Sequence, residues 1–276
     1  MSSHASQVRP APARETVRIT LITDDGSPSV WDAPVGITLD AFFQQAQPHW
    51  TPPSHPDKAI IGETVMAALV DNELRGLEFP VKRDVTVKPV SISHTDGLRI
   101  YRRSLTLLLL AAINDLFPGT KIAVTNSLPS GGYVCEVRQG TDFSAQQIEQ
   151  IEGRMRELVE VDEPIVRQAV PKPDANALAQ KNGDQDKLRL YEARKQNYVT
   201  LYELNGITEF FAGYLAPSTG YLTAFFLSRF EDNFVLSYPG RGRPLEIEPP
   251  QLFEKMRGVY QQTTRWLQLL DLSLIH

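Results

Sequence analysis

The chain has 276 residues, 28 lysines and arginines against 33 aspartates and glutamates, and a formal net charge of −5. Its 42% hydrophobic and 22% charged residues are ordinary for a globular protein of about two domains. The acidic balance argues against a general nucleic-acid coat, which needs a basic excess to displace counterions, but it leaves room for a local basic pocket. The single cysteine, Cys135, excludes an internal disulfide framework.

Residues 1–15 are small, polar and proline-containing, which predicts a disordered tail without the apolar core of a signal peptide. No apolar run approaches the length needed to span a bilayer. We therefore expect a cytoplasmic protein without a membrane partner.

Residues 16–92 are expected to form one small domain. Its first segment, 17–23, alternates apolar and polar residues and is rich in β-branched side chains, which is typical of a strand. Thr38 is placed to cap a helix over 38–46. Further strands are predicted over 29–33, 65–70, 77–81 and 85–90. The order strand, strand, helix and more strands predicts a β-grasp domain.

A linker over 93–97 is expected to lead into a second, larger α+β domain over 98–244, with an antiparallel sheet and helices on it. Helices are predicted over 99–117, 144–160, 174–182 and 184–194, and strands over 121–126, 132–137, 198–204, 207–211, 221–230 and 234–238. The end of the chain, 245–276, is expected to contain an amphipathic helix over 250–272.

Two resemblances accompany this reading. The run Ala67-Ala-Leu-Val-Asp-Asn-Glu-Leu-Arg-Gly-Leu77 resembles the third strand and turn of TGS domains, which are β-grasp modules. The region from Arg99 to about Pro244 resembles the second additional domain of threonyl- and alanyl-tRNA synthetases. Its matching motifs include Asp115-Leu-Phe-Pro118, Gly131-Gly-Tyr133, Asp162-Glu-Pro-Ile-Val-Arg167 and Pro217-Ser-Thr-Gly220.

The chemical groups of that synthetase domain are replaced here. The resemblance places Arg103 and Leu107 where the editing family has His-x-x-x-His, Phe211 and Leu215 where it has Cys-x-x-x-His, and Glu209 where it has an Asp. The four positions that hold His or Cys in the editing family therefore supply no imidazole or thiolate here. The five histidines of the chain lie in tails, linkers or the small domain. We therefore expect no zinc and no catalytic residue at this site. Cys135 has no histidine placed as its base.

A third resemblance is to bacterial proteins that join a TGS domain, this synthetase-like domain and a uridine-kinase-like P-loop domain. It rests on Arg99-Ile-Tyr-Arg-Arg-Ser-Leu105, Tyr198-Val-Thr-Leu-Tyr202, Phe234-Val-Leu-Ser-Tyr-Pro239 and Pro250-Gln-Leu-Phe-Glu254. The chain contains no Gly-x-x-x-x-Gly-Lys-Ser/Thr motif. The resemblance implies that this chain corresponds to the N-terminal half of such a protein, whose partner would be an absent C-terminal kinase domain. ATP and Mg²⁺ are expected to bind only that kinase domain, and no cofactor is expected in this chain.

The preferred function at this point is a non-catalytic regulatory or ligand-binding region of a nucleoside-kinase-like protein. The alternative is an RNA- or tRNA-binding module, or an altered aminoacyl-tRNA editing module, related to threonyl-tRNA synthetase; enzymatic activity is left open. Partners would be a small anionic ligand or nucleotide, RNA, or a second copy in a homodimer. The candidate ligand-binding residues are Arg102, Arg103, Lys121, Tyr133, Glu209, Phe211, Tyr214 and Leu215. Arg102 and Arg103 are expected either to bind phosphate or carboxylate, or to form a salt bridge at the pocket floor or a solvated helix start.

Overall fold

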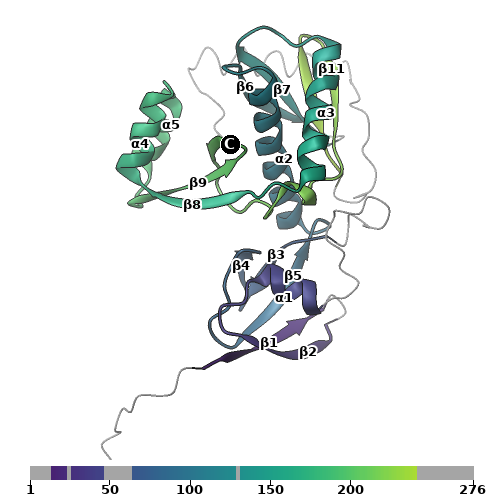
Figure 1. Cartoon of the computed structure of the whole chain (residues 1–276), viewed down its shortest axis with the longest axis vertical. Coiled ribbons are helices and arrows are strands. Elements are labelled where there is room, and N and C mark those ends of the chain that lie inside the picture. The colour runs from purple at the N-terminus through teal and green to yellow at the C-terminus, as the bar shows by residue number, and fades with distance from the viewer. Residues whose placement is uncertain (1–13, 24–25, 47–63, 129–130, 241–276) are drawn as a thin grey trace, which may run out of the picture.

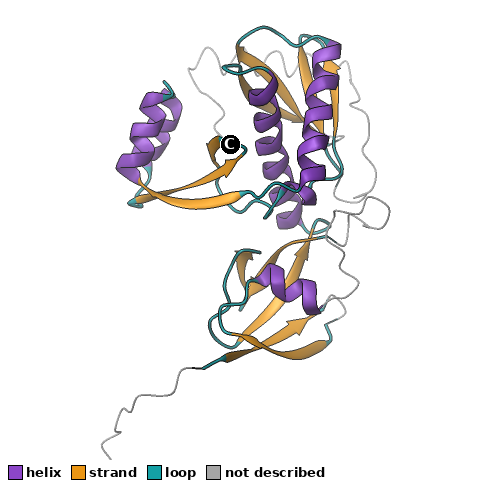
Figure 2. Cartoon of the chain, in the orientation of Figure 1, coloured by secondary structure: helices purple, strands orange, loops and turns teal. Residues whose placement is uncertain are grey.

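Figure 1 shows the computed structural model, which describes residues 14–23, 26–46, 64–128 and 131–240. The first part of the chain forms a five-stranded mixed sheet in the order β2-β1-β5-β3-β4, in which β1 and β5 are parallel and the other pairs antiparallel. Helix α1 packs on this sheet (Figures 1 and 2). The elements are β1 (Thr16–Ile22), β2 (Pro28–Pro34), α1 (Leu39–Ala46), β3 (Val65–Val70), β4 (Glu73–Gly76) and β5 (Val85–Ser91). This is the expected β-grasp arrangement.

The alternation of β1 produces the core of this first part. Val17, Ile19 and Leu21 are buried and face the same side of the strand. They join a cluster with Phe42 and Phe43 of α1. The opposite face of the sheet carries the intervening, more exposed side chains.

The second part places two long helices on a four-stranded antiparallel sheet in the order β11-β12-β7-β6 (Figure 1). Ser144 and Gln147 form a capping box at the start of α3, as a serine followed by glutamine three residues later favours. The elements are α2 (Thr95–Leu116), β6 (Lys121–Leu128), β7 (Gly132–Gln139), α3 (Ala145–Val161), β11 (Phe226–Phe230) and β12 (Asn233–Ser237).

A third, three-stranded sheet in the order β10-β9-β8 carries two short helices to one side (Figure 1). It has its own small core of Ala175, Ala179, Tyr191, Val199 and Leu201. Tyr202 and Leu204 of the middle strand instead join the main core beside α2. The elements are β8 (Val166–Pro171), α4 (Lys172–Lys181), α5 (Gln185–Ala193), β9 (Tyr198–Leu204) and β10 (Ile207–Phe210).

The α+β class with several sheets and helices is confirmed, and three local predictions are wrong. Residues 77–81 do not form a strand, and the hairpin partner of β3 is instead β4. Segment 93–97 is not a linker, because His94 caps a helix that already begins at Thr95. The strand predicted over 221–230 begins only at Phe226, after a 3₁₀ turn at Thr219–Tyr221.

Two further predictions concern residues outside the described ranges: most of the tail 1–15 and the helix over 250–272. Within the described ranges, no helix is both long enough and apolar enough to span a membrane.

Candidate functional site

Helix α2 meets the loop that follows β10, and three contacts fix this loop. The Ser104 hydroxyl accepts a hydrogen bond from the backbone N–H of Ala216 at 2.8 Å. The Tyr202 hydroxyl donates to the carbonyl of Gly213 at 2.7 Å. Gly213 has a φ of +127°, and a Cβ atom there would lie 2.5 Å from a guanidinium nitrogen of Arg103. The positive φ favours glycine here, and the absent Cβ lets the end of the Arg103 side chain lie close to the backbone.

Arg103 is half-buried at this junction, and the carboxylate of Asp96 acts on its charge without forming a salt bridge. It forms no salt bridge and no hydrogen bond with any described residue. Burial and the charge of Arg99 lower the pKa of its guanidinium, while Tyr133, Tyr202 and the carboxylate of Asp96 act in the opposite direction. An arginine keeps its charge despite such a shift, so it offers a cation with free donors beside two aromatic side chains.

Arg102 belongs to an aromatic stack next to this cation. Its guanidinium carbon lies 4.4 Å from the centre of the Tyr238 ring, and that ring lies 5.0 Å from the ring of Tyr133. Burial raises the pKa of Tyr238 to about 12, against the opposing effect of Arg102. The Nε of Arg102 is buried and has no hydrogen-bond partner among the described residues.

Three of the four positions of the editing motif hold side chains that pack in the core. Leu107 and Leu215 are 0% and 2% exposed and belong to one core cluster. Phe211 packs edge-on against Tyr202, with ring centres 6.4 Å apart. With Arg103 at the remaining position, the arrangement offers no group that could act as nucleophile or general base at neutral pH.

Cys135 does not supply the missing nucleophile. It is fully buried on β7, and burial raises the pKa of its thiol to about 12. The thiol is therefore protonated at neutral pH and packs as a small core residue.

Two candidate residues pair away from this junction, and a third turns toward the first sheet. Glu209 forms a salt bridge with Lys187 of α5 at 2.8 Å. The ammonium group of Lys121, at the opposite end of the β6–β7 pair from Tyr133, donates to the carbonyl of Asn182 at 3.2 Å. Tyr214 turns toward the first sheet, where a Cβ on Gly76 would lie 2.7 Å from its ring. The structure thus groups Arg102, Arg103, Tyr133, Phe211 and Leu215. Tyr214 lies in the same loop and interacts with Tyr202, although its ring turns toward the first sheet, while Lys121 and Glu209 pair elsewhere.

Sequence reasoning missed Ser104, Tyr202, Gly213 and Tyr238, which position or complete this junction. Ser104 had a usable signal, because a serine in the middle of a helix, among leucines, requires a hydrogen-bond partner once buried. The tyrosines gave no such signal, since tyrosines in strands are ordinary packing residues.

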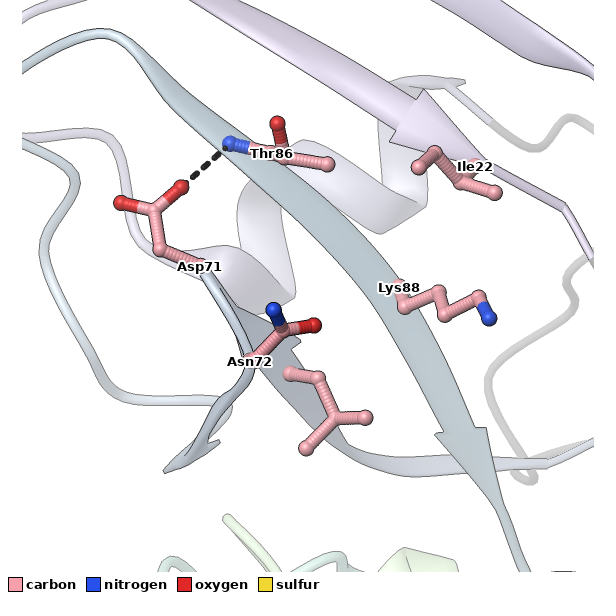
Figure 3. A pocket seen from close by; sticks show the side chains of 6 residues that line it. Ile22, Asp71, Asn72, Thr86 and Lys88 are labelled. Atoms are coloured by element: carbon pink, nitrogen blue, oxygen red, sulfur yellow. Dashed lines mark hydrogen bonds between the residues drawn. The ribbon is translucent and has the colours of Figure 1, made fainter.

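An open hollow of about 380 Å³ lies elsewhere, on the first sheet (Figure 3). It is lined by Ile22, Leu69, Asp71, Asn72, Thr86 and Lys88. None of the candidate residues from the sequence lines it.

Comparison with known proteins found no matching family model. The chain is 29% identical over 170 residues to threonine–tRNA ligases of Burkholderia lata and Anaplasma marginale, which is 61% of this chain and 27% of each ligase. It is 28% identical over 210 residues to the threonine–tRNA ligase of Symbiobacterium thermophilum, which is 76% of this chain and 30% of that ligase. The matched region thus spans less than a third of the length of these relatives. By these matches, the chain is similar to the N-terminal region of threonine–tRNA ligases.

Proposed function

We propose that this chain is an RNA-binding module related to the tRNA-editing region of threonyl-tRNA synthetases, in which the hydrolytic groups have been replaced. The observation that carries the proposal is Arg103, which forms no salt bridge with any described residue and lies against Gly213 and beside Tyr133 and Tyr202. The similarity to threonine–tRNA ligases supports RNA, and tRNA in particular, as the ligand.

The chemistry of the junction suits a single-stranded RNA end. Arginine binds phosphate through its planar fork of donors, and aromatic side chains stack on unpaired bases. Arg103 would supply the phosphate contact, and Tyr133 or Phe211 a surface for a base. With one or two phosphates neutralised and a net charge of −5, binding should depend only weakly on salt, with a log–log slope of about −1 to −2.

Hydrolysis of the bound RNA or its aminoacyl ester is not part of this proposal. A water molecule needs a general base within hydrogen-bond reach to attack an ester. The editing positions hold two buried leucines, a phenylalanine and an arginine, none of which takes up a proton at neutral pH.

Fluorescence anisotropy with a labelled tRNA acceptor-stem hairpin tests the proposal. Arg103→Ala should weaken binding about ten- to a hundred-fold, as the loss of a charge-assisted hydrogen bond of about 1.5–3 kcal/mol implies. Arg229→Ala is the matched control, because Arg229 is an exposed arginine on β11 whose hydrogen bond goes to the carbonyl of Glu231. No binding by the unchanged chain, or equal losses for the two variants, would refute the proposal.

The regulatory region of a nucleoside-kinase-like protein is the second candidate. It is favoured by the sequence runs Arg99–Leu105 and Phe234–Pro239, and the matched ligases give it no support. Binding of nucleoside phosphates but not tRNA, lost on Arg103→Ala, would favour it over the first proposal.

A further inference from the structure

The hollow on the first sheet combines an apolar floor with one lysine. Lys88 of β5 pairs with Leu69 of β3, and Ile22 of β1 follows Leu21, which pairs with Val87. The three side chains therefore form a row across the middle of the sheet, on the face opposite α1, and Figure 3 shows Lys88 and Ile22 beside one another. Lys88 is exposed and forms no salt bridge with any described residue.

The turn between β3 and β4 supplies the polar wall. Asp71 and Asn72 have φ values of +49° and +68°, which a two-residue hairpin turn of type I′ requires. The carboxylate of Asp71 accepts a hydrogen bond from the Thr86 N–H at 2.9 Å and pairs with Arg83 at 2.8 Å. Its charge is thereby largely offset, and among the described residues that line the hollow Lys88 is the charged group without an opposite charge paired to it.

The conformation of the turn does not itself require asparagine at position 72. Glycine is the residue most favoured at this second turn position, yet the chain carries an amide that lines the hollow (Figure 3). No described residue is recorded as a hydrogen-bond partner of that amide. An asparagine side chain can donate and accept at once, which suits the edge of a nucleobase.

We propose that this hollow binds a mononucleotide, with its phosphate on Lys88, its base against Ile22 and Leu69, and the edge of the base on Asn72. The volume of about 380 Å³ lies at the lower end of the range for small-molecule sites, which fits a ligand of this size. A free amino acid fits less well, because its ammonium group would lie beside Lys88 while Asp71 is already engaged by Arg83 and Thr86. The proposal is independent of the function proposed for the α2 junction.

Titration of the ¹⁵N-labelled chain with adenosine and uridine monophosphates tests this site. Backbone amide shifts should be confined to residues around 22, 69–73 and 86–88, and Lys88→Gln should weaken binding at least tenfold. Asn72→Gly keeps the positive φ of the turn, so it should fold normally and still weaken nucleotide binding at least fivefold. Lys82→Gln, at an exposed lysine outside the hollow, is the control.

Three outcomes would overturn the proposal. They are the absence of shifts at 10 mM nucleotide, unchanged affinity in both Lys88→Gln and Asn72→Gly, and equal affinity for inorganic phosphate or threonine.

Discussion

Replacing Ser104 by alanine isolates the bond between α2 and the loop after β10. The change removes one oxygen atom from a fully buried site and leaves the N–H of Ala216 without its acceptor at 2.8 Å. The carbonyl of Ile100, to which the hydroxyl donates, keeps its helical N–H partner. The cost is therefore that of one buried, unsatisfied donor, about 1–3 kcal/mol.

Urea denaturation followed by circular dichroism measures this cost. With a slope of about 2 kcal/mol per molar urea, a loss of about 2 kcal/mol lowers the midpoint by about 1 M. Thr106→Ala is the matched control, because Thr106 makes the same hydroxyl contact to a carbonyl four residues earlier but no recorded bond outside the helix. It should change the free energy of unfolding by less than about 0.5 kcal/mol. Equal midpoints for the two variants would refute the role assigned to Ser104.

Three other predictions concern groups whose surroundings the structure defines. With a pKa of about 12, the Cys135 thiol should be ionised in about one molecule in ten thousand at pH 8. A thiol reagent should therefore modify the native chain at least a hundred-fold more slowly than the urea-unfolded chain. Elemental analysis should find no stoichiometric zinc and a deacylation assay no hydrolysis of Ser-tRNA; one zinc per chain or robust hydrolysis would contradict the reading of the editing positions. Lys187→Met should destabilise α5 by about 1–3 kcal/mol, seen as faster amide exchange there, whereas Lys181→Met on α4 should not. Burial alone lowers the pKa of Lys187 but the carboxylates of Glu209 and Asp184 raise it overall, so its stabilisation should persist at neutral pH and disappear as the pH rises through that raised pKa.

The sequence predicted best those elements whose pattern and burial agree. The alternation of 17–23 and the helix predicted over 144–160 both reappear in the structure, because local preference and tertiary packing favour the same conformation. Segment 77–81 shows the opposite case. Leu77 and Val81 are fully buried, so their hydrophobicity reports burial. The backbone of this segment forms hydrogen bonds to residues 36–40 and an isolated bridge between Pro80 and Thr38, but no strand.

Strand β4 was missed for the complementary reason. Its four residues lack β-branched side chains, and it forms because the Asp71–Asn72 turn folds it back on β3. At the candidate site, the convergence of Arg103 with the loop before Pro217 was expected from the synthetase resemblance. The salt bridge of Glu209 was not expected, because its partner Lys187 lies 22 residues earlier in a helix whose position depends on tertiary packing.

Helix α2 has a consequence for how the chain can be divided. Its first turns contact β3 and β5, its later turns contact β9 and β10, and the cap at His94 precedes the boundary expected at residue 98. Tyr221 provides a second contact between the two parts of the chain, since its hydroxyl donates a hydrogen bond to Asp40 of α1 at 2.8 Å. A fragment cut at residue 98 would begin inside a helix, without its cap and with part of its apolar surface uncovered. The two halves should consequently be poor candidates for exchange as cassettes between proteins, unless the cut is moved ahead of residue 93 and the Tyr221 contact is replaced.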